Sequence, residues 1–164
     1  MRSRFAWAVV LIGVVGVMAG STATVLATPP VGSTPVSLAP VGHYDEINLN
    51  TKFDAWKLKF ETHGDSDMYV TQVTIAPGGT TGWHMHPGPS FLIVKSGTAT
   101  FYQGADATCT PQVVTAGNSV LENAQTVHIV RNEGTVPLVN VVVQFVPRGA
   151  LRTISMPRPG NCSF

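Results

Sequence analysis

Two histidines stand one residue apart in the segment 78–97, which reads GGTTGWHMHPGPSFLIVKSG. In a β-strand, residues i and i+2 point to the same face, so His84 and His86 would project together. Two imidazoles on one face offer two adjacent ligand positions to a divalent metal ion. The best candidate for a third ligand is His128, which valine and isoleucine flank in the segment TVHIV. An imidazole in that setting is expected to be buried, and binding to a metal would satisfy it.

Imidazole ligands suit zinc, copper, iron or nickel better than magnesium or calcium. We therefore expect a divalent zinc, copper, manganese or iron ion as the cofactor. The alternative is that the three histidines are hydrogen-bonded structural residues that hold no metal. The other two histidines, His43 and His63, are expected at the surface. The chain has no GxSxG segment, and neither cysteine lies near a histidine, so no catalytic nucleophile is identified.

The elements that must position these histidines are strands. From residue 43 onward, apolar and polar residues alternate with period two, and no helical period is found. The segment AWKLKFE is expected to be a half-buried strand with Trp56, Leu58 and Phe60 on its apolar face. The segment SFLIVKSGTATFYQG, residues 90–104, is expected to be a hairpin that turns at Lys95-Ser96-Gly97. Short strands separated by turns predict an all-β sandwich or barrel.

The spacing of the histidines matches a known pattern. The first cupin motif is G-x5-H-x-H-x3-4-E-x6-G, and the second is G-x5-P-x-G-x2-H-x3-N. The matching positions here are Gly78, His84, His86, Gly97, Gly117, His128 and Asn132. The chain therefore resembles a single-domain cupin. The resemblance implies a double-stranded β-helix, or jelly-roll barrel, over residues 43–150. It also implies metal binding by the three histidines and, as is common in the family, a homodimer.

Three positions depart from the motifs. The metal-binding glutamate of the first motif is replaced by Ser90, and the proline and glycine of the second are Asn123 and Gln125. Some cupins, including thiol dioxygenases, hold a metal with three histidines and no carboxylate, so metal binding is still expected. The cation would then keep its full double charge. Ser90 is either a hydrogen-bond partner of a metal-bound water or an ordinary hydroxyl at the start of a strand.

The N-terminal segment predicts export. Two arginines precede an uncharged apolar run over residues 5–19, and small residues follow, which is the pattern of a signal peptide over residues 1–27. An uncleaved membrane anchor is the alternative, and it would be the only contact with a membrane. Residues 28–42 contain four prolines and are expected to be a linker or an extended arm. The mature protein would lie outside the cell or in the cell envelope.

The two cysteines, Cys109 and Cys162, would pair in an oxidising compartment. The disulfide would tie the C-terminal tail, residues 151–164, to the barrel, whereas the alternative is two separate thiols. The net charge of +1 and the absence of a basic run exclude nucleic acid as an expected partner.

Three functions remain open for a protein of this kind. In the first, the metal activates water or dioxygen or polarises a carbonyl group of a small-molecule substrate, as in a dioxygenase. In the second, the barrel binds a small molecule or the metal without turnover. In the third, the barrel holds no metal. A titratable group beside the metal would favour the enzyme, and no carboxylate is identified for that role in the sequence.

Overall fold

The computed structural model describes residues 26–164. All secondary-structure elements assigned in that part are β-strands. Residues 1–25 of the predicted signal peptide lie outside the described part. Among the described residues, no helix has the length and apolarity to cross a membrane. The strands, in chain order, are β1 (Val31–Ser37), β2 (Gly42–Tyr44), β3 (Asn48–Phe53), β4 (Trp56–Glu61), β5 (Ser66–Thr80), β6 (His84–Met85), β7 (Ser90–Ser96), β8 (Thr98–Gln103), β9 (Gln112–Thr115), β10 (Ser119–Glu122), β11 (His128–Arg131), β12 (Leu138–Pro147) and β13 (Ile154–Ser155).

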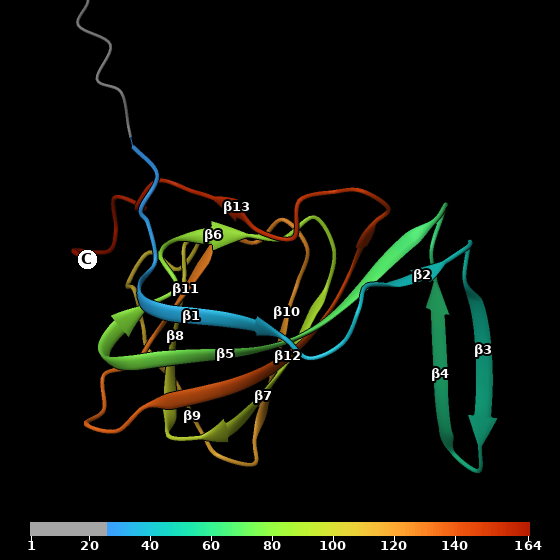
Figure 1. Cartoon of the computed structure of the whole chain (residues 1–164), viewed down its shortest axis with the longest axis horizontal. Helices are drawn as coiled ribbons and strands as arrows, with labels where there is room; N and C mark the ends of the chain where they lie inside the picture. The colour runs from blue at the N-terminus through green and yellow to red at the C-terminus, as the bar shows by residue number, and fades with distance from the viewer. Residues whose placement is uncertain (1–25) are drawn as a thin grey trace, which may run out of the picture.

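Most strands form one hydrogen-bonded sheet that folds into two layers (Figure 1). One layer has the order β10-β7-β12-β5, with β1 and β2 on the other side of β5. The second layer has the order β9-β8-β11-β6-β13, and a single pairing of Arg131 with Thr80 joins it to β5. This is the jelly-roll architecture that the motif resemblance implied.

The main apolar core lies between the two layers. It contains Leu92 and Val142 from the first layer and Phe101 and Val130 from the second, all buried. Every second residue of β12 from Leu138 to Val146 is buried, and the apolar residues Leu138 and Val142 of this set belong to the core. Burial of such side chains stabilises the fold by about 2 kcal/mol each. The sequence did not identify this face in advance, because the polar residues Asn140 and Gln144 also lie on it.

The predicted hairpin over residues 90–104 is wrong. Strand β7 pairs with β10 and β12, whereas β8 pairs with β11 and β9, so the two strands belong to different layers. The chain crosses between the layers at Gly97, which has a φ of 78°. A Cβ atom there would lie 2.7 Å from the Pro137 carbonyl oxygen, so the close passage of two backbones requires glycine.

Two N-terminal segments differ from a simple linker and barrel. Within the proline-rich segment, β1 pairs with β5, so it adds a strand to the first layer. Strands β3 and β4 form a separate two-stranded hairpin that stands away from the barrel (Figure 1). Of the face expected to be half-buried, Trp56 and Leu58 are exposed, whereas Phe60 is partly buried with its ring centroid 4.9 Å from that of Phe145. The homodimer expected from the resemblance stays a prediction.

A disulfide joins Cys109 to Cys162, with 5.5 Å between the two Cα atoms. It lies in a second apolar cluster at the C-terminal end of the molecule. Trp83 is fully buried in this cluster, and its Nε1–H group donates a hydrogen bond of 3.0 Å to the carbonyl oxygen of Phe164. The tail is thereby attached to the second layer by a covalent bond, by packing and by hydrogen bonds.

The turn after β11 is organised by Asn132, which is 1% exposed. Its Nδ2 group donates two hydrogen bonds of 2.8 Å, to the carbonyl oxygens of Ile75 and Val136. Its Oδ1 atom accepts one of 3.1 Å from the amide of Gly134. This one side chain therefore forms hydrogen bonds with three backbone groups at the end of the barrel.

The Asn132→Ala variant is expected to lower the free energy of unfolding by about 2–3 kcal/mol, because it leaves buried backbone groups without partners. Urea denaturation would measure this loss. The matched control is Asn118→Ala, since Asn118 also bonds to its own turn but is exposed, and its loss should stay below about 1 kcal/mol. Equal losses in both variants would contradict the role given to Asn132.

Candidate metal centre

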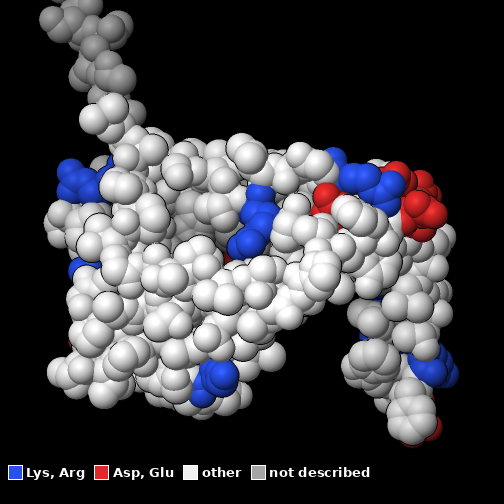
Figure 2. Space-filling view, viewed as in Figure 1, with Lys and Arg blue, Asp and Glu red and all other residues white. Residues whose placement is uncertain are grey.

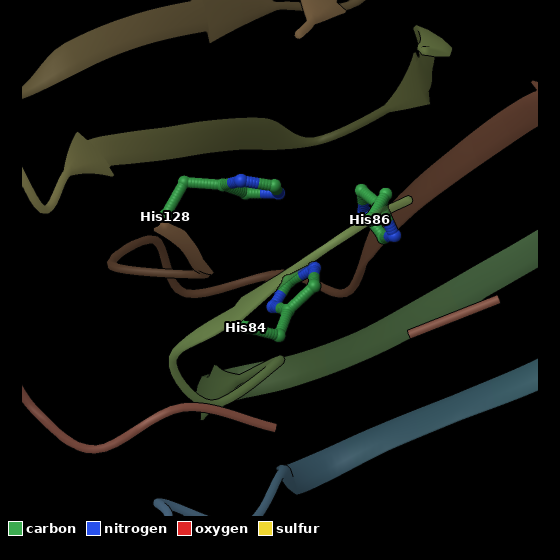
Figure 3. A group of neighbouring side chains, drawn as sticks. All are labelled: His84, His86 and His128. Carbon is green, nitrogen blue, oxygen red and sulfur yellow. The ribbon is translucent and has the colours of Figure 1, made fainter. Parts of the chain in front are cut away.

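Strand pairing brings the three predicted histidines together. His84 begins β6, His128 begins β11, and these two residues are direct partners in the ladder between the strands. His86 follows two residues after His84, at the end of β6. All three side chains are buried, and one nitrogen of each lies within 4.8 Å of the others. Figure 3 shows the three rings pointing into one common space from separate positions on the backbone.

The hydrogen bonds of the three rings determine which nitrogen carries the proton. Each Nδ1 atom lies beside a backbone carbonyl oxygen: Gly82 at 2.8 Å from His84, Arg152 at 2.7 Å from His86, and Thr126 at 2.8 Å from His128. A carbonyl oxygen only accepts hydrogen bonds, so each Nδ1 is the protonated nitrogen. Each Nε2 is then left with a free lone pair directed away from the backbone.

His86 has one further neighbour at its Nδ1 atom, because the side-chain amide nitrogen of Gln144 lies 2.9 Å away. An amide nitrogen donates and would require an unprotonated Nδ1. The carbonyl contact is shorter, and the Gln144 amide oxygen is already occupied by Arg152 Nε at 3.1 Å. We therefore assign the proton to Nδ1 of His86, as in the other two rings.

The structure adds a carboxylate that the sequence analysis did not place. Glu122, at the end of β10, is 5% exposed. Its Oε2 atom lies 3.3 Å from Nε2 of His86, and its Oε1 atom lies 3.4 Å from Nε2 of His128. Glu122 is the direct cross-strand partner of Ser90, so the carboxylate enters from the strand next to the one that the motif uses.

A signal for Glu122 was present in the sequence. In the segment SVLEN, Glu122 shares its face with Val120, which belongs to the core. An acidic residue on the apolar face of a short strand is uncommon unless it has a partner. The sequence did not predict that β10 pairs with β7. This pairing places the face of β10 that carries Glu122 beside the histidines.

Charge at the centre follows from burial and proximity. Burial by itself would raise the pKa of Glu122, but His128 and His86 hold it well below its usual range. Burial, together with His128, lowers the pKa of His84 to about 4, so this ring stays neutral. Burial disfavours a charge on His128 as well, but the Glu122 carboxylate outweighs it and raises the pKa of that ring.

The donor set fits a divalent metal ion. Three Nε2 lone pairs and one carboxylate face one another, and Nε2 of His128 has no hydrogen-bond partner within residues 26–164. Such a group of acceptors repels itself unless a cation or a proton lies among them. Metal-bound histidines ordinarily donate their second N–H to a carbonyl or carboxylate, as all three rings do here.

A cavity of about 180 Å³ adjoins the centre. Its walls include His84, His86 and Glu122, together with apolar side chains from both layers and the amides of Asn140 and Gln144. Figure 2 shows this face of the molecule hollowed, with one basic group beside the hollow, while most of the acidic groups seen there gather near β2. The arrangement gives a small ligand direct access to the histidines.

The other predicted site residues have different positions. Ser90 is buried, and its Oγ atom has no hydrogen-bond partner in the described part of the chain. Among the polar residues on strands, Gln144 lines the cavity, whereas Tyr69, Gln72 and Tyr102 do not. His63 is exposed, and His43 is a surface residue whose Nδ1 lies 2.7 Å from Asp67.

Comparison with known proteins supports the same architecture. A family model described as "Cupin domain" matches residues 71–144, a range that includes the three histidines and Glu122. None of the curated protein sequences matches the chain significantly. A polyketide cyclase from Streptomyces resistomycificus aligns with a TM-score of 0.54 at 13% identity, covering 84% of this chain and 82% of that one.

Two further solved structures have lower scores. A cupin-like protein from Thermotoga maritima has a TM-score of 0.48 at 19% identity, over 58% of this chain and 79% of that one. A cupin superfamily protein from Desulfitobacterium hafniense has a TM-score of 0.46 at 10% identity, over 70% of this chain and 77% of that one. At such identities the likeness concerns the fold alone.

Proposed function

We propose that this chain, which carries a cupin domain over residues 71–144, is an exported protein whose barrel holds one divalent metal ion and transforms a small molecule there. The observation that carries this proposal is the cluster of three buried imidazoles, each with its Nδ1 bonded to a carbonyl, together with the buried Glu122 carboxylate beside Nε2 of two of them. The three Nε2 atoms and a Glu122 carboxylate oxygen are therefore available as four metal ligands.

The proposed ligands are His84, His86, His128 and Glu122. Three imidazoles and one carboxylate suit zinc, manganese, iron or copper. When bound, such an ion supplies Lewis-acid activation of water or dioxygen, or polarises a carbonyl group. Glu122 would reduce the net charge of the centre from +2 to about +1, which replaces the earlier expectation of an uncompensated cation.

The chain's own residues prepare the site for this chemistry. The carbonyl groups of Gly82, Thr126 and Arg152 hold the three rings in one orientation each. Glu122 has a depressed pKa, so it remains an anion and hydrogen-bond acceptor at neutral pH. The apolar cavity walls limit water around the ligand, which strengthens the electrostatic interactions within the site. These features favour dioxygenase-type or related chemistry over simple storage of a metal.

Export is part of the proposal. The disulfide between Cys109 and Cys162 supports it, because structural disulfides are rare where thiols are kept reduced. The predicted signal peptide would direct the chain to the cell envelope or to the outside of the cell.

One observation favours a second candidate, a barrel that binds a small molecule without a metal. Glu122 lies near Nε2 of both His86 and His128, so a proton on His128 would satisfy the carboxylate as an ion pair. The raised pKa of His128 is consistent with that state. The two candidates differ in whether the purified protein contains metal.

Metal content is therefore the decisive measurement. The full-length chain would be produced through an oxidising export route, purified without chelator or metal-affinity resin, and examined by elemental analysis. We expect about one zinc, copper, manganese or iron ion per chain, and we expect the His128→Ala variant to lose most of it because one of four ligands is missing. The control is His63→Ala, which removes an exposed histidine.

Retention of metal in His128→Ala would contradict the assigned site. Absence of metal from the unmodified protein, even after incubation with zinc, copper, manganese and iron(II), would refute the metal centre. The ion pair between Glu122 and His128 would then be the resting state of a metal-free binding protein.

A further inference from the structure

Among residues 26–164, Arg152 is the only lysine or arginine that lines the cavity. It lies in the segment between β12 and β13, outside the stretch that matches the family model. Its Nε atom donates a hydrogen bond of 3.1 Å to the Gln144 amide oxygen, and its guanidinium carbon lies 5.1 Å from the ring centroid of Tyr69. These contacts hold the guanidinium in place and leave its terminal nitrogens without a hydrogen-bond acceptor in the described part of the chain.

The charge of Arg152 is not balanced by the protein. Arg131 and Arg148 each have a carboxylate partner, whereas Arg152 has none within 4 Å among residues 26–164. It is nevertheless partly buried, and burial lowers its pKa. A partly buried cation costs free energy unless an anion or several hydrogen-bond acceptors compensate it. The missing anion is therefore expected from a molecule that enters the cavity.

The size and lining of the cavity limit what that molecule can be. A volume of about 180 Å³ corresponds to roughly six water molecules, so the ligand is small. Much of the wall is apolar, formed by Val73, Leu92, Val130 and Val142. A single guanidinium beside apolar walls suits a monoanion with a short carbon chain better than a phosphate dianion, which needs more donors.

We propose that the ligand is a small carboxylate, whose carboxylate group forms a paired hydrogen bond with the guanidinium of Arg152 while its carbon chain extends toward His84 and His86. The proposal deepens, and rests on, the metal-dependent function argued above. Arg152 would have two roles, because its own carbonyl oxygen accepts the Nδ1–H bond of His86. The residue that selects the ligand also orients one ring of the proposed centre.

The test is a binding experiment with isosteric acids and amides. Butyrate, pyruvate and lactate would be titrated into the exported protein by calorimetry, beside their neutral amides. The variants are Arg152→Gln, which removes the charge, and Arg152→Lys, which keeps the charge but loses the paired geometry. The control is Arg158→Gln, because Arg158 is an exposed arginine in the same tail. Zinc content is measured for each protein, and the titrations are run on zinc-loaded and metal-free samples.

We expect at least one of the three acids to bind the unmodified protein and the Arg158→Gln variant equally. Its binding to Arg152→Gln should be weaker by at least about tenfold, as for other hydrogen bonds to charged groups, with Arg152→Lys intermediate. The amides should bind no better to the unmodified protein than to Arg152→Gln. Zinc content should be the same in all four proteins, because the substitutions leave the backbone carbonyl in place.

The inference is overturned if the acids bind Arg152→Gln as tightly as the unmodified protein, if the amides bind as well as the acids, or if none of the acids binds. These outcomes are separate from failure of the metal centre. A protein that holds no zinc but still binds an acid through Arg152 refutes the metal function and keeps the carboxylate site. Normal zinc content, with acid binding that does not depend on Arg152, keeps the metal function and refutes the carboxylate site.

Discussion

The Glu122→Gln variant is expected to bind zinc about 100-fold more weakly than the unmodified protein, a loss of about 3 kcal/mol. The substitution keeps the size of the side chain and removes the one negative charge that faces the three Nε2 lone pairs. A competition titration against a chromogenic zinc chelator would measure the change. The control is Glu46→Gln, because Glu46 is exposed.

A second variant, in which the carboxylate is moved from position 122 to position 90, tests the same prediction independently. Ser90 and Glu122 are direct partners in the β7–β10 ladder, so their side chains point to the same face. The double variant Ser90→Glu/Glu122→Ser should therefore recover part of the affinity that Glu122→Gln loses. If Glu122→Gln binds zinc as tightly as the unmodified protein, Glu122 is not a ligand and the centre consists of three histidines alone.

Loss of the disulfide is expected to produce the largest change in stability. The two cysteines are 53 residues apart in sequence, and the loop-entropy relation gives about 4 kcal/mol for a ring of that length. The Cys109→Ser/Cys162→Ser variant should unfold at a correspondingly lower guanidinium concentration. A reductant should shift the unmodified protein by a similar amount and leave the variant unchanged. A shift of the variant by the reductant would mean that the effect is not due to this bond.

Local patterns in the sequence predicted the fold class and three of the four proposed metal ligands. Short segments of strand-forming residues separated by turns predicted an all-β barrel, and every element assigned in the described part of the chain is a β-strand. The spacing of the two motifs predicted that His84, His86 and His128 share one site. The structure places all three rings in one space, as the spacing predicted.

The missing parts depend on which strands are neighbours, and spacing along the chain does not determine that. Glu122 joins the histidines only because β10 pairs with β7, and Arg152 reaches the cavity because the chain returns over it after β12. The segment 90–104 has the appearance of a hairpin, but its two strands belong to different layers. Trp56 lies at the opposite end of β4 from Phe60, whose ring packs on Phe145 of the barrel, so the alternating pattern indicated a burial of Trp56 that does not occur.

The bond between Cys109 and Cys162 closes a covalent ring that contains Glu122, His128 and Arg152, while His84 and His86 lie outside it. In an oxidised chain that has not yet folded, the three enclosed residues are already confined near one another, so less entropy is lost when they assemble. Anything that binds only the folded state adds to the same stabilisation. If the proposed metal centre forms, a chain oxidised before it meets the metal should load faster, and keep the ion longer against a chelator, than one still reduced.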